Sequence, residues 1–212
     1  MGEIRARSQE EKAEKLESIL SAARLMLREK SYEKISLIEL AKHAGIAKST
    51  LYVYCKTRED LFLWVWEAAY EDFIQRLQRR VKAGSGSIQA YAKAYYEELV
   101  RDELLLPLIE QLHLVIEKNS TPEVVRDFKL RMQVSFDGLA QVAAAKMGCE
   151  PQTFMDFFLF CHIQTTGLYQ AANMPEETKR MLADSAASRF VIDFRSALQR
   201  SVLVIAKGLD IG

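Results

Sequence analysis

The segment from Ser36 to Thr57 constrains the fold of this chain more than any other, because it predicts two short helices joined by a tight turn. Ser36 and Glu39 have the spacing of a capping box, in which two side chains satisfy backbone N–H groups at the start of a helix. Gly45 follows that helix, and glycine readily adopts the positive φ that lets a second helix leave at a steep angle. Apolar residues mark the face that the pair would bury: Leu37, Leu40, Ala41, Ala44, Ile46 and Leu51. The segment is therefore predicted to form a helix-turn-helix.

The second helix of this pair carries polar and aromatic side chains on its outer face. We predict that these residues contact DNA: Lys48, Ser49, Thr50, Tyr52, Tyr54 and Lys56. Lysine, hydroxyl and phenol groups can bind phosphates, and side chains near the start of a recognition helix reach base edges in the major groove. A short polar helix can also be an ordinary solvated surface. The capping box and the glycine turn favour the DNA-binding interpretation.

Four short stretches of this region resemble the N-terminal signature of the TetR family of one-component regulators. They are Leu40-Ala41, Ala44-Gly45-Ile46, Thr50-Leu51-Tyr52 and Thr57-Arg58-Glu59-Asp60-Leu61. Three positions depart from the family pattern: Ala47 replaces a usual Ser, Ser49 a usual Gly, and Cys55 a usual Phe. We expect Ala47 to leave the second helix without a hydroxyl cap, and Cys55 to pack more loosely than a ring would.

The resemblance covers roughly residues 10–75 and implies an architecture for the whole chain. It implies an all-α homodimer, with a three-helix DNA-binding domain at residues 1–57 and a larger helical ligand-binding and dimerisation domain at residues 58–212. In the family, the helix after the helix-turn-helix transmits the ligand signal. Here that helix is apolar nearly all round between Leu61 and Tyr70, which predicts burial on more than one side.

The pattern of residues predicts helices throughout. Only nine glycines and four prolines occur, and no segment shows the sustained alternation of strands. About nine helices are expected: residues 9–29, the pair described above, 58–82, 88–103, 107–117, 121–147, 152–172 and 176–207, the last with an irregularity near Asp184. The glycine- and serine-containing stretch Ala83–Ser87 is expected to be a flexible linker.

Composition and charge narrow the classes of partner. Formal net charge is zero, but the residues up to Arg58 hold 12 basic and 8 acidic side chains, so this end is +4 and the remainder −4. That polarity is consistent with orientation on DNA. No apolar run approaches the roughly 20 residues that span a bilayer, and the N-terminus lacks the apolar segment of a secretion signal. Three separated cysteines without a CxxC pair fit a reducing compartment, so we expect a cytoplasmic protein without disulfides or structural zinc.

Aromatic and polar side chains in the C-terminal part suggest an effector site. The residues proposed to bind a ligand are Trp66, Tyr70, Tyr95, His113, Met132, Phe136, His162 and Tyr169. Aromatic walls with a few polar tips are typical of small-molecule sites, although ordinary helical core also accounts for most of these residues. His113 and His162 lack the paired spacing of metal ligands, and we expect neither metal nor cofactor.

Two apolar stripes near the C-terminus suggest the contact between two copies. The residues proposed for this interface are Phe154, Phe158, Cys161, Phe190, Phe194 and Leu198. Two such helices from each copy could form a four-helix bundle across a two-fold axis. Packing of both stripes within one subunit is the alternative, and part of each stripe is expected to do so.

Enzymatic motifs are missing: the chain has no GxSxG, P-loop or GxGxxG sequence. We therefore expect a DNA-binding regulator, a repressor released from a palindromic operator by a small apolar or amphipathic ligand, rather than an enzyme. The alternative is a helical ligand-binding or protein-interaction module without specific DNA binding.

Overall fold

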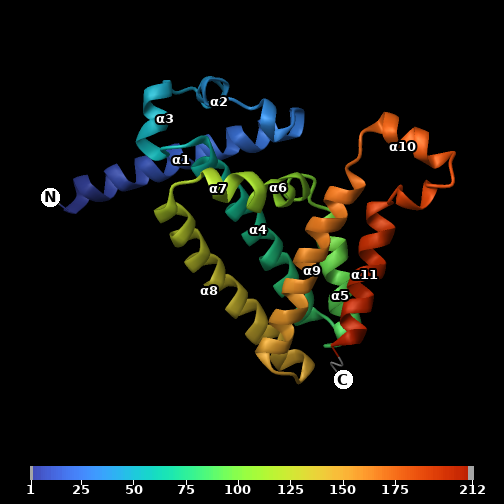
Figure 1. Cartoon of the computed structure of the whole chain (residues 1–212). Helices are drawn as coiled ribbons and strands as arrows, with labels where there is room; N and C mark the ends of the chain where they lie inside the picture. Colours follow the sequence, from blue (N-terminus) through green and yellow to red (C-terminus); the bar gives the residue numbers. More distant parts are fainter. Residues whose placement is uncertain (1, 210–212) are drawn as a thin grey trace. The chain divides into compact units, whose positions relative to one another are not determined.

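The structure is a computed structural model, which describes the backbone of residues 2–209 and the side chains of residues 11–209. Every regular element among them is helical, which confirms the all-α prediction (Figure 1). The elements are α1 Gly2–Glu29, the 3₁₀ turn η1 Tyr32–Lys34, α2 Leu37–His43, α3 Lys48–Tyr54, α4 Arg58–Ala83, α5 Ile88–Val100, α6 Leu105–Gln111, the π-helical η2 Leu112–Ile116, α7 Glu117–Asn119, α8 Pro122–Met147, α9 Pro151–Ala172, α10 Glu176–Ala183, the 3₁₀ turn η3 Ser188–Phe190 and α11 Phe194–Gly208. Among these described helices, none is long and apolar enough to cross a membrane.

The chain divides into two compact units whose boundaries fall inside α4 and α8. Unit 1 comprises the residues up to Tyr70 together with Glu103–Arg131, and unit 2 comprises Glu71–Asp102 together with the residues from Met132 onward. This division does not coincide with the functional division proposed at residue 58. Unit 1 contains the helix-turn-helix and also the first half of α4.

The core of unit 1 forms where α1, α2, α3 and α4 bury their apolar faces. The buried residues include Ile19, Ala23, Met26, Leu40, Leu51 and Phe62. Tyr32 of η1 packs edge-on against Phe62, with ring centroids 4.8 Å apart. Further along α4, Trp66 packs edge-on against Phe128 of α8 at 5.4 Å. Within unit 1, α4 is thus buried on more than one side, as its all-round apolar sequence predicts.

Unit 2 has an aromatic core in which α5, α9 and α11 meet. Tyr91 of α5 lies edge-on to Phe154 and Phe157 of α9, with centroids 4.7 and 5.4 Å apart. Tyr95, one turn later, contacts Phe158 in the same way at 5.8 Å, and its hydroxyl lies 3.2 Å from the Thr165 hydroxyl. These contacts fix which face of α9 is turned inward.

The glycine-rich stretch after α4 is a tight turn inside unit 2, not a linker between domains. Gly86 has φ +79, and a Cβ atom there would lie 2.5 Å from the carbonyl oxygen of Lys146 at the end of α8. The close approach of the two backbones therefore requires glycine. The sequence pattern indicated flexibility because it could not reveal this contact.

Two expected helices also differ from the structure. The helix expected over 107–117 begins at Leu105 and passes through the π-helical turn η2 before α7 ends it. The helix expected over 176–207 is two helices, because α10 ends at Ala183 and a new helix begins at Phe194. Asp193 caps that second start by accepting a 2.8 Å hydrogen bond from the backbone N–H of Ser196. The irregularity near Asp184 is therefore a complete break.

Candidate nucleic-acid interface

The helix-turn-helix is held by the local interactions that its sequence predicts. Ser36 Oγ accepts a hydrogen bond from the Glu39 N–H at 3.3 Å, and the Ser36 N–H donates to Glu39 Oε2 at 3.2 Å, so the capping box is complete. Gly45 adopts φ +66 in the turn. Ala47 occupies the N-cap of α3 without a side-chain bond, as expected for a residue with no hydroxyl.

The short helix α3 buries one side and exposes the rest. Leu51 is its one buried residue, and Cys55 lies buried directly after it. The Cys55 thiol donates a 3.7 Å hydrogen bond to the Leu51 carbonyl, while burial and the nearby Asp60 charge raise the pKa of Cys55 to about 11. Cys55 is therefore an apolar plug that stays protonated at neutral pH.

The six residues predicted to contact DNA lie on the accessible side of this helix or just after it. Lys48, Ser49, Tyr52 and Lys56 are exposed, whereas Thr50 and Tyr54 are half-buried. Lys48 Nζ lies 5.7 Å from the centroid of the Tyr52 ring, one helical turn away. The Lys48 ammonium and the Tyr52 phenol therefore lie next to each other on the exposed surface of α3.

Val53 is an additional exposed residue that the sequence reasoning did not include. It lies on α3 with 74% of its surface accessible. The signal for it was present, because Ser49, Tyr52, Val53 and Lys56 follow the i, i+3, i+4, i+7 spacing of one helical face. An exposed aliphatic group on a recognition helix suits contact with a thymine methyl.

An aromatic and charged cluster fixes the start of α4 against the turn before α2. The Arg58 guanidinium lies 4.4 Å from the centroid of the Tyr32 ring and donates to the Ile35 carbonyl at 3.2 Å. The Tyr32 hydroxyl donates to Glu59 Oε1 at 3.0 Å. Burial, and then the adjacent Glu59 carboxylate, raise the pKa of Tyr32 above its ordinary value. This cluster holds the start of α4 against the residues that precede the helix-turn-helix.

Asp60 connects the segment after α3 with the start of α8. Its fully buried carboxylate accepts hydrogen bonds from the backbone N–H groups of Lys56 and Thr57 at 3.1 and 3.0 Å. The Thr57 hydroxyl in turn accepts from the Asp60 N–H at 3.0 Å, which makes a second capping box at the start of α4. On its other side, Asp60 accepts from the Thr121 N–H at 2.6 Å and from the Thr121 hydroxyl at 2.8 Å.

The electrostatics of Asp60 follow from these donors. Burial alone would raise the pKa of Asp60, but the hydrogen bonds from Thr121 and Thr57 outweigh it and hold the pKa below its usual value. The carboxylate is therefore ionised at neutral pH. One buried charge links Lys56, a predicted DNA contact, to Thr121, the residue directly before α8.

The residues proposed for an effector site are distributed over both units. Trp66, Tyr70 and His113 belong to unit 1, and the others belong to unit 2: Tyr95, Met132, Phe136, His162 and Tyr169. Trp66 stacks on Tyr70 with centroids 4.3 Å apart, and His113 is exposed beside Glu117 at 3.1 Å.

Unit 2 contains a cavity of about 170 Å³, lined partly by Val81, Ala90, Tyr91, Ala94 and Met147. None of the eight proposed effector residues lines it. The cavity is also below the roughly 300–1,000 Å³ of typical ligand sites. The effector residues therefore stay a proposal.

The residues proposed for the dimer contact require a correction. Phe154, Phe158, Cys161 and Leu198 are buried within their own subunit and have no surface to offer a second copy. Phe194 is half-buried and contacts Tyr169 edge-on at 5.3 Å, while Phe190 is exposed. The sequence pattern identified an apolar face of α9, but that face packs on α5 and α11.

A different apolar face of α9 and α11 is accessible. Its exposed or half-buried residues, which we call the outer face, are Leu159, Phe160, Ile163, Val204 and Ile205. A groove of about 390 Å³ runs across it, lined by Phe160, Ile163, Gln164, Ile205, Gly208 and Leu209. A contiguous exposed apolar patch of this kind marks an interaction surface.

Comparison with known proteins identifies the family. Residues 19–65 match the model of bacterial regulatory proteins of the tetR family, a range that includes the helix-turn-helix and its capping boxes. Residues 67–212 match the model of the tetracyclin repressor-like C-terminal domain. The chain belongs to the TetR family. It is a DNA-binding transcriptional regulator, as the exposed face of α3 predicts.

The individual proteins that the chain resembles are distant in sequence. The chain is 31% identical over 72 residues to the fatty acid metabolism regulator protein of Bacillus subtilis, and the match spans 34% of this chain and 37% of that protein. A TetR transcriptional regulator from Rhodococcus sp. RHA1 has a similar fold, with a TM-score of 0.56 and 17% identity, over 92% of this chain and 97% of the other. A putative TetR-family transcriptional regulator from Mesorhizobium loti also has a similar fold, with a TM-score of 0.52 and 19% identity, over 92% of this chain and 96% of the other. At these identities the two structures bear on the fold alone.

Proposed function

We propose that this regulator is a repressor that binds a roughly palindromic operator as a homodimer and leaves it when a small apolar or amphipathic ligand binds. The observation that carries the proposal is the exposed face of α3, with Lys48, Tyr52 and Val53 projecting from a helix that buries Leu51 alone. The same proposal includes a cytoplasmic location and a lack of enzymatic activity. It also includes a DNA-binding domain at residues 1–57 and a ligand-binding and dimerisation domain at residues 58–212.

In this proposal the DNA contacts divide by role. Lys48, at the start of α3, reaches base edges, and Val53 contacts a thymine methyl. Ser49, Thr50, Tyr52, Tyr54 and Lys56 bind phosphates on either side. The phosphate contacts set affinity and its salt dependence, whereas the base contacts set sequence preference.

The outer face supports the homodimer. A two-fold axis through this face would pair α9 and α11 with their copies and would cover Phe160, Ile163 and Val204. Because these apolar residues are exposed in one subunit, their burial favours association.

Asp60 supports a route from ligand to DNA. Its carboxylate binds Thr121 at the start of α8 and Lys56 beside α3, both within unit 1. A ligand changes operator affinity only if it favours one arrangement of such an element over another. We propose that displacement of the start of α8 moves the segment after α3 through this carboxylate.

An amphipathic ligand class agrees with the name of the Bacillus subtilis relative, which concerns fatty acid metabolism. The effector would bind through the aromatic residues proposed from the sequence.

Selection of bound sequences from random duplex DNA, followed by titration of the enriched site, tests the function. We expect a palindromic site with half-sites about one helical turn apart, bound in the nanomolar range. Lys48→Ala should relax the preference at one base of each half-site, and Lys93→Ala, at an exposed lysine of α5, is the matched control. Recovery of no preferred sequence would favour the alternative of a helical module without specific DNA binding.

A further inference from the structure

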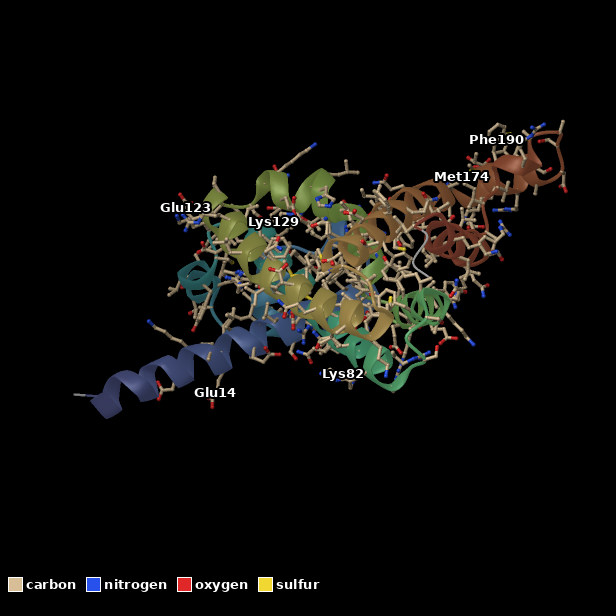
Figure 2. The ribbon with its side chains drawn as sticks, turned by 90° about the horizontal axis from the view of Figure 1, so that it is seen from below. Glu14, Lys82, Glu123, Lys129, Met174 and Phe190 are labelled. Carbon is tan, nitrogen blue, oxygen red and sulfur yellow. The ribbon has the colours of Figure 1, made fainter. Side chains whose placement is uncertain are left out.

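The cavity of about 170 Å³ in unit 2 lies where the end of α4, the start of α5 and the end of α8 meet. Val81, Tyr91 and Ala94 are its buried apolar residues, and Met147, at the end of α8, is half-buried beside them. Figure 2 labels Lys82, the neighbour of Val81 at this end of α4. Since the eight residues proposed for the effector site do not line this cavity, it is a separate feature of the molecule.

The turn on one side of the cavity is held by backbone contacts. Gly84 and Gly86 both line the cavity, and Gly86 comes so close to α8 that a Cβ atom there would lie 2.5 Å from the Lys146 carbonyl oxygen. Ser87 then caps α5, because its hydroxyl accepts a hydrogen bond from the Ala90 N–H at 3.2 Å. The cavity therefore has a wall whose backbone is fixed before any ligand arrives.

Arg80 lines the same cavity and contributes a positive charge. Its guanidinium pairs with Glu98 at 3.2 Å and with Glu97 at 2.5 Å, which uses two of the five N–H donors and holds the group in place. Both carboxylates are shared with other cations. Glu98 also lies 3.2 Å from Arg76, and Glu97 lies 3.8 Å from Lys93. The Arg80 guanidinium therefore retains charge and N–H donors for a further anion.

The volume and the lining of the cavity define a class of ligand. Typical ligand sites are larger, so the occupant must be small. An apolar cavity of roughly 150 Å³ is large enough to bind benzene, and a cavity of about 170 Å³ therefore holds one ring with a small substituent. Val81, Tyr91 and Ala94 offer apolar surface to such a body, whereas the planar guanidinium of Arg80 matches a carboxylate.

We propose that this cavity binds a small carboxylate with a compact apolar body, of which benzoate is the simplest aromatic example. The carboxylate pairs with Arg80, and the body packs against Val81, Tyr91 and Ala94. The inference goes beyond the proposed repressor function and does not depend on it. Because such a ligand contacts α4, α5 and α8 together, it stabilises the folded form of unit 2.

Titration of the full-length protein with benzoate, followed by NMR of isotope-labelled methionine methyl groups, tests the site. The chain has seven methionines, of which Met147 lines the cavity and Met26 is buried in unit 1. We expect the Met147 signal to shift with a Kd of about 1 mM and the Met26 signal to stay in place. No shift of Met147 at about ten times that concentration would overturn the proposal.

Two further ligands separate the apolar body from the charge. Benzyl alcohol keeps the ring without the charge, and acetate keeps the charge without the ring, so each should bind at least about tenfold more weakly than benzoate. Ala90→Leu, which adds bulk to the lining, should abolish the benzoate shift, and Ala145→Leu at an exposed position of α8 is the matched control. Equal binding of benzyl alcohol and benzoate, or undiminished benzoate binding by Ala90→Leu, would contradict the proposed site.

The role of Arg80 is tested by a substitution that keeps its charge. Arg80→Lys loses the planar pair of donors, and we expect its Kd for benzoate to rise about fivefold while its Kd for benzyl alcohol stays unchanged. Arg79→Lys, the same change at the neighbouring exposed arginine outside the cavity, should stay within about twofold of wild type for both ligands. If Arg80→Lys weakens both ligands equally, or neither, Arg80 does not bind the carboxylate and the proposal is wrong.

Discussion

The helix-turn-helix and the stretch from α9 to α11 differ in how far their structure depends on distant residues. In the first, the bonds that fix helix starts join residues three positions apart, as between Ser36 and Glu39. In the second, α9 is apolar on two faces, with Phe158 buried and Phe160 exposed. The inner face is chosen by Tyr95 of α5, which is 63 positions from Phe158 and contacts its ring.

This difference separates two kinds of information in a sequence. Caps and glycine turns are local, so they place an element and its ends in the chain. The orientation of an all-round apolar helix depends on which neighbours cover it, and those neighbours are determined by the fold as a whole.

The largest expected effect distinguishes the two faces of α9. Phe158→Glu puts a charge among buried rings and should cost at least about 4 kcal/mol of unfolding free energy, a large fraction of the roughly 5–15 kcal/mol that stabilises a typical native domain. Phe160→Glu, on the outer face, should leave the subunit folded but weaken association. Urea denaturation and ultracentrifugation of both variants measure the two effects. Equal stability of the two variants would mean that the inner and outer faces are wrongly assigned.

Asp60 provides the next effect, because it joins local caps to a distant contact. Asp60→Asn removes the charge from a buried acceptor of four hydrogen bonds, and we expect a loss of about 1–3 kcal/mol in unfolding free energy. Thr121→Val, which removes one donor from the distant side, should cost less and should preserve the cap of α4. If both variants match wild type in urea denaturation, the carboxylate does not hold the two segments together.

The stabilisation by Asp60 should depend on pH with a defined sign. Its pKa in the folded chain is below its usual value, so the stabilisation is fully present above the unfolded pKa of about 3.9. It is lost as pH falls through the lower, folded pKa. The difference in unfolding free energy between wild type and Asp60→Asn should therefore be constant from pH 7 to pH 5 and should shrink below about pH 4. A difference that grows on acidification would contradict the assignment.

Measurements of DNA binding test the exposed side of the helix-turn-helix. Lys56→Ala should weaken binding to every sequence by about tenfold at moderate salt and reduce the slope of log K against log salt by about one. Tyr52→Phe, which keeps the ring but removes the hydroxyl, should have a smaller effect. Titrations at several salt concentrations measure the slope. An unchanged slope in Lys56→Ala would remove Lys56 from the phosphate contacts.

The smallest expected effect concerns a purely local bond. Ser36→Ala breaks the capping box of α2 and should cost about 1 kcal/mol of unfolding free energy. Ser36→Asp restores an acceptor and should recover most of the loss, although the nearby Glu39 carboxylate opposes it. A loss as large as that of Asp60→Asn would mean that this cap carries tertiary as well as local stability.

The sequence by itself determined the elements that local chemistry defines. The capping box of α2, the turn at Gly45, the start of α4 at Thr57 and the extent of α8 follow from side chains that act on backbone groups a few residues away. The exposure of the face of α3 that we propose to contact DNA followed in the same way, since one short helix with Leu51 as its apolar anchor leaves most other side chains accessible.

Only the tertiary structure decided which apolar surfaces are core and which remain open. Phe154 and Phe160 are equally apolar and lie on the same helix, less than two turns apart. Tyr91 covers Phe154, whereas nothing in the described part of the subunit buries Phe160. Gly86 is a close contact with Lys146 instead of a linker, and Asp60 binds Thr121 at a separation of 61 residues. Hydropathy and spacing report what a side chain is, whereas burial depends on what lies opposite it, and that is a property of the folded chain.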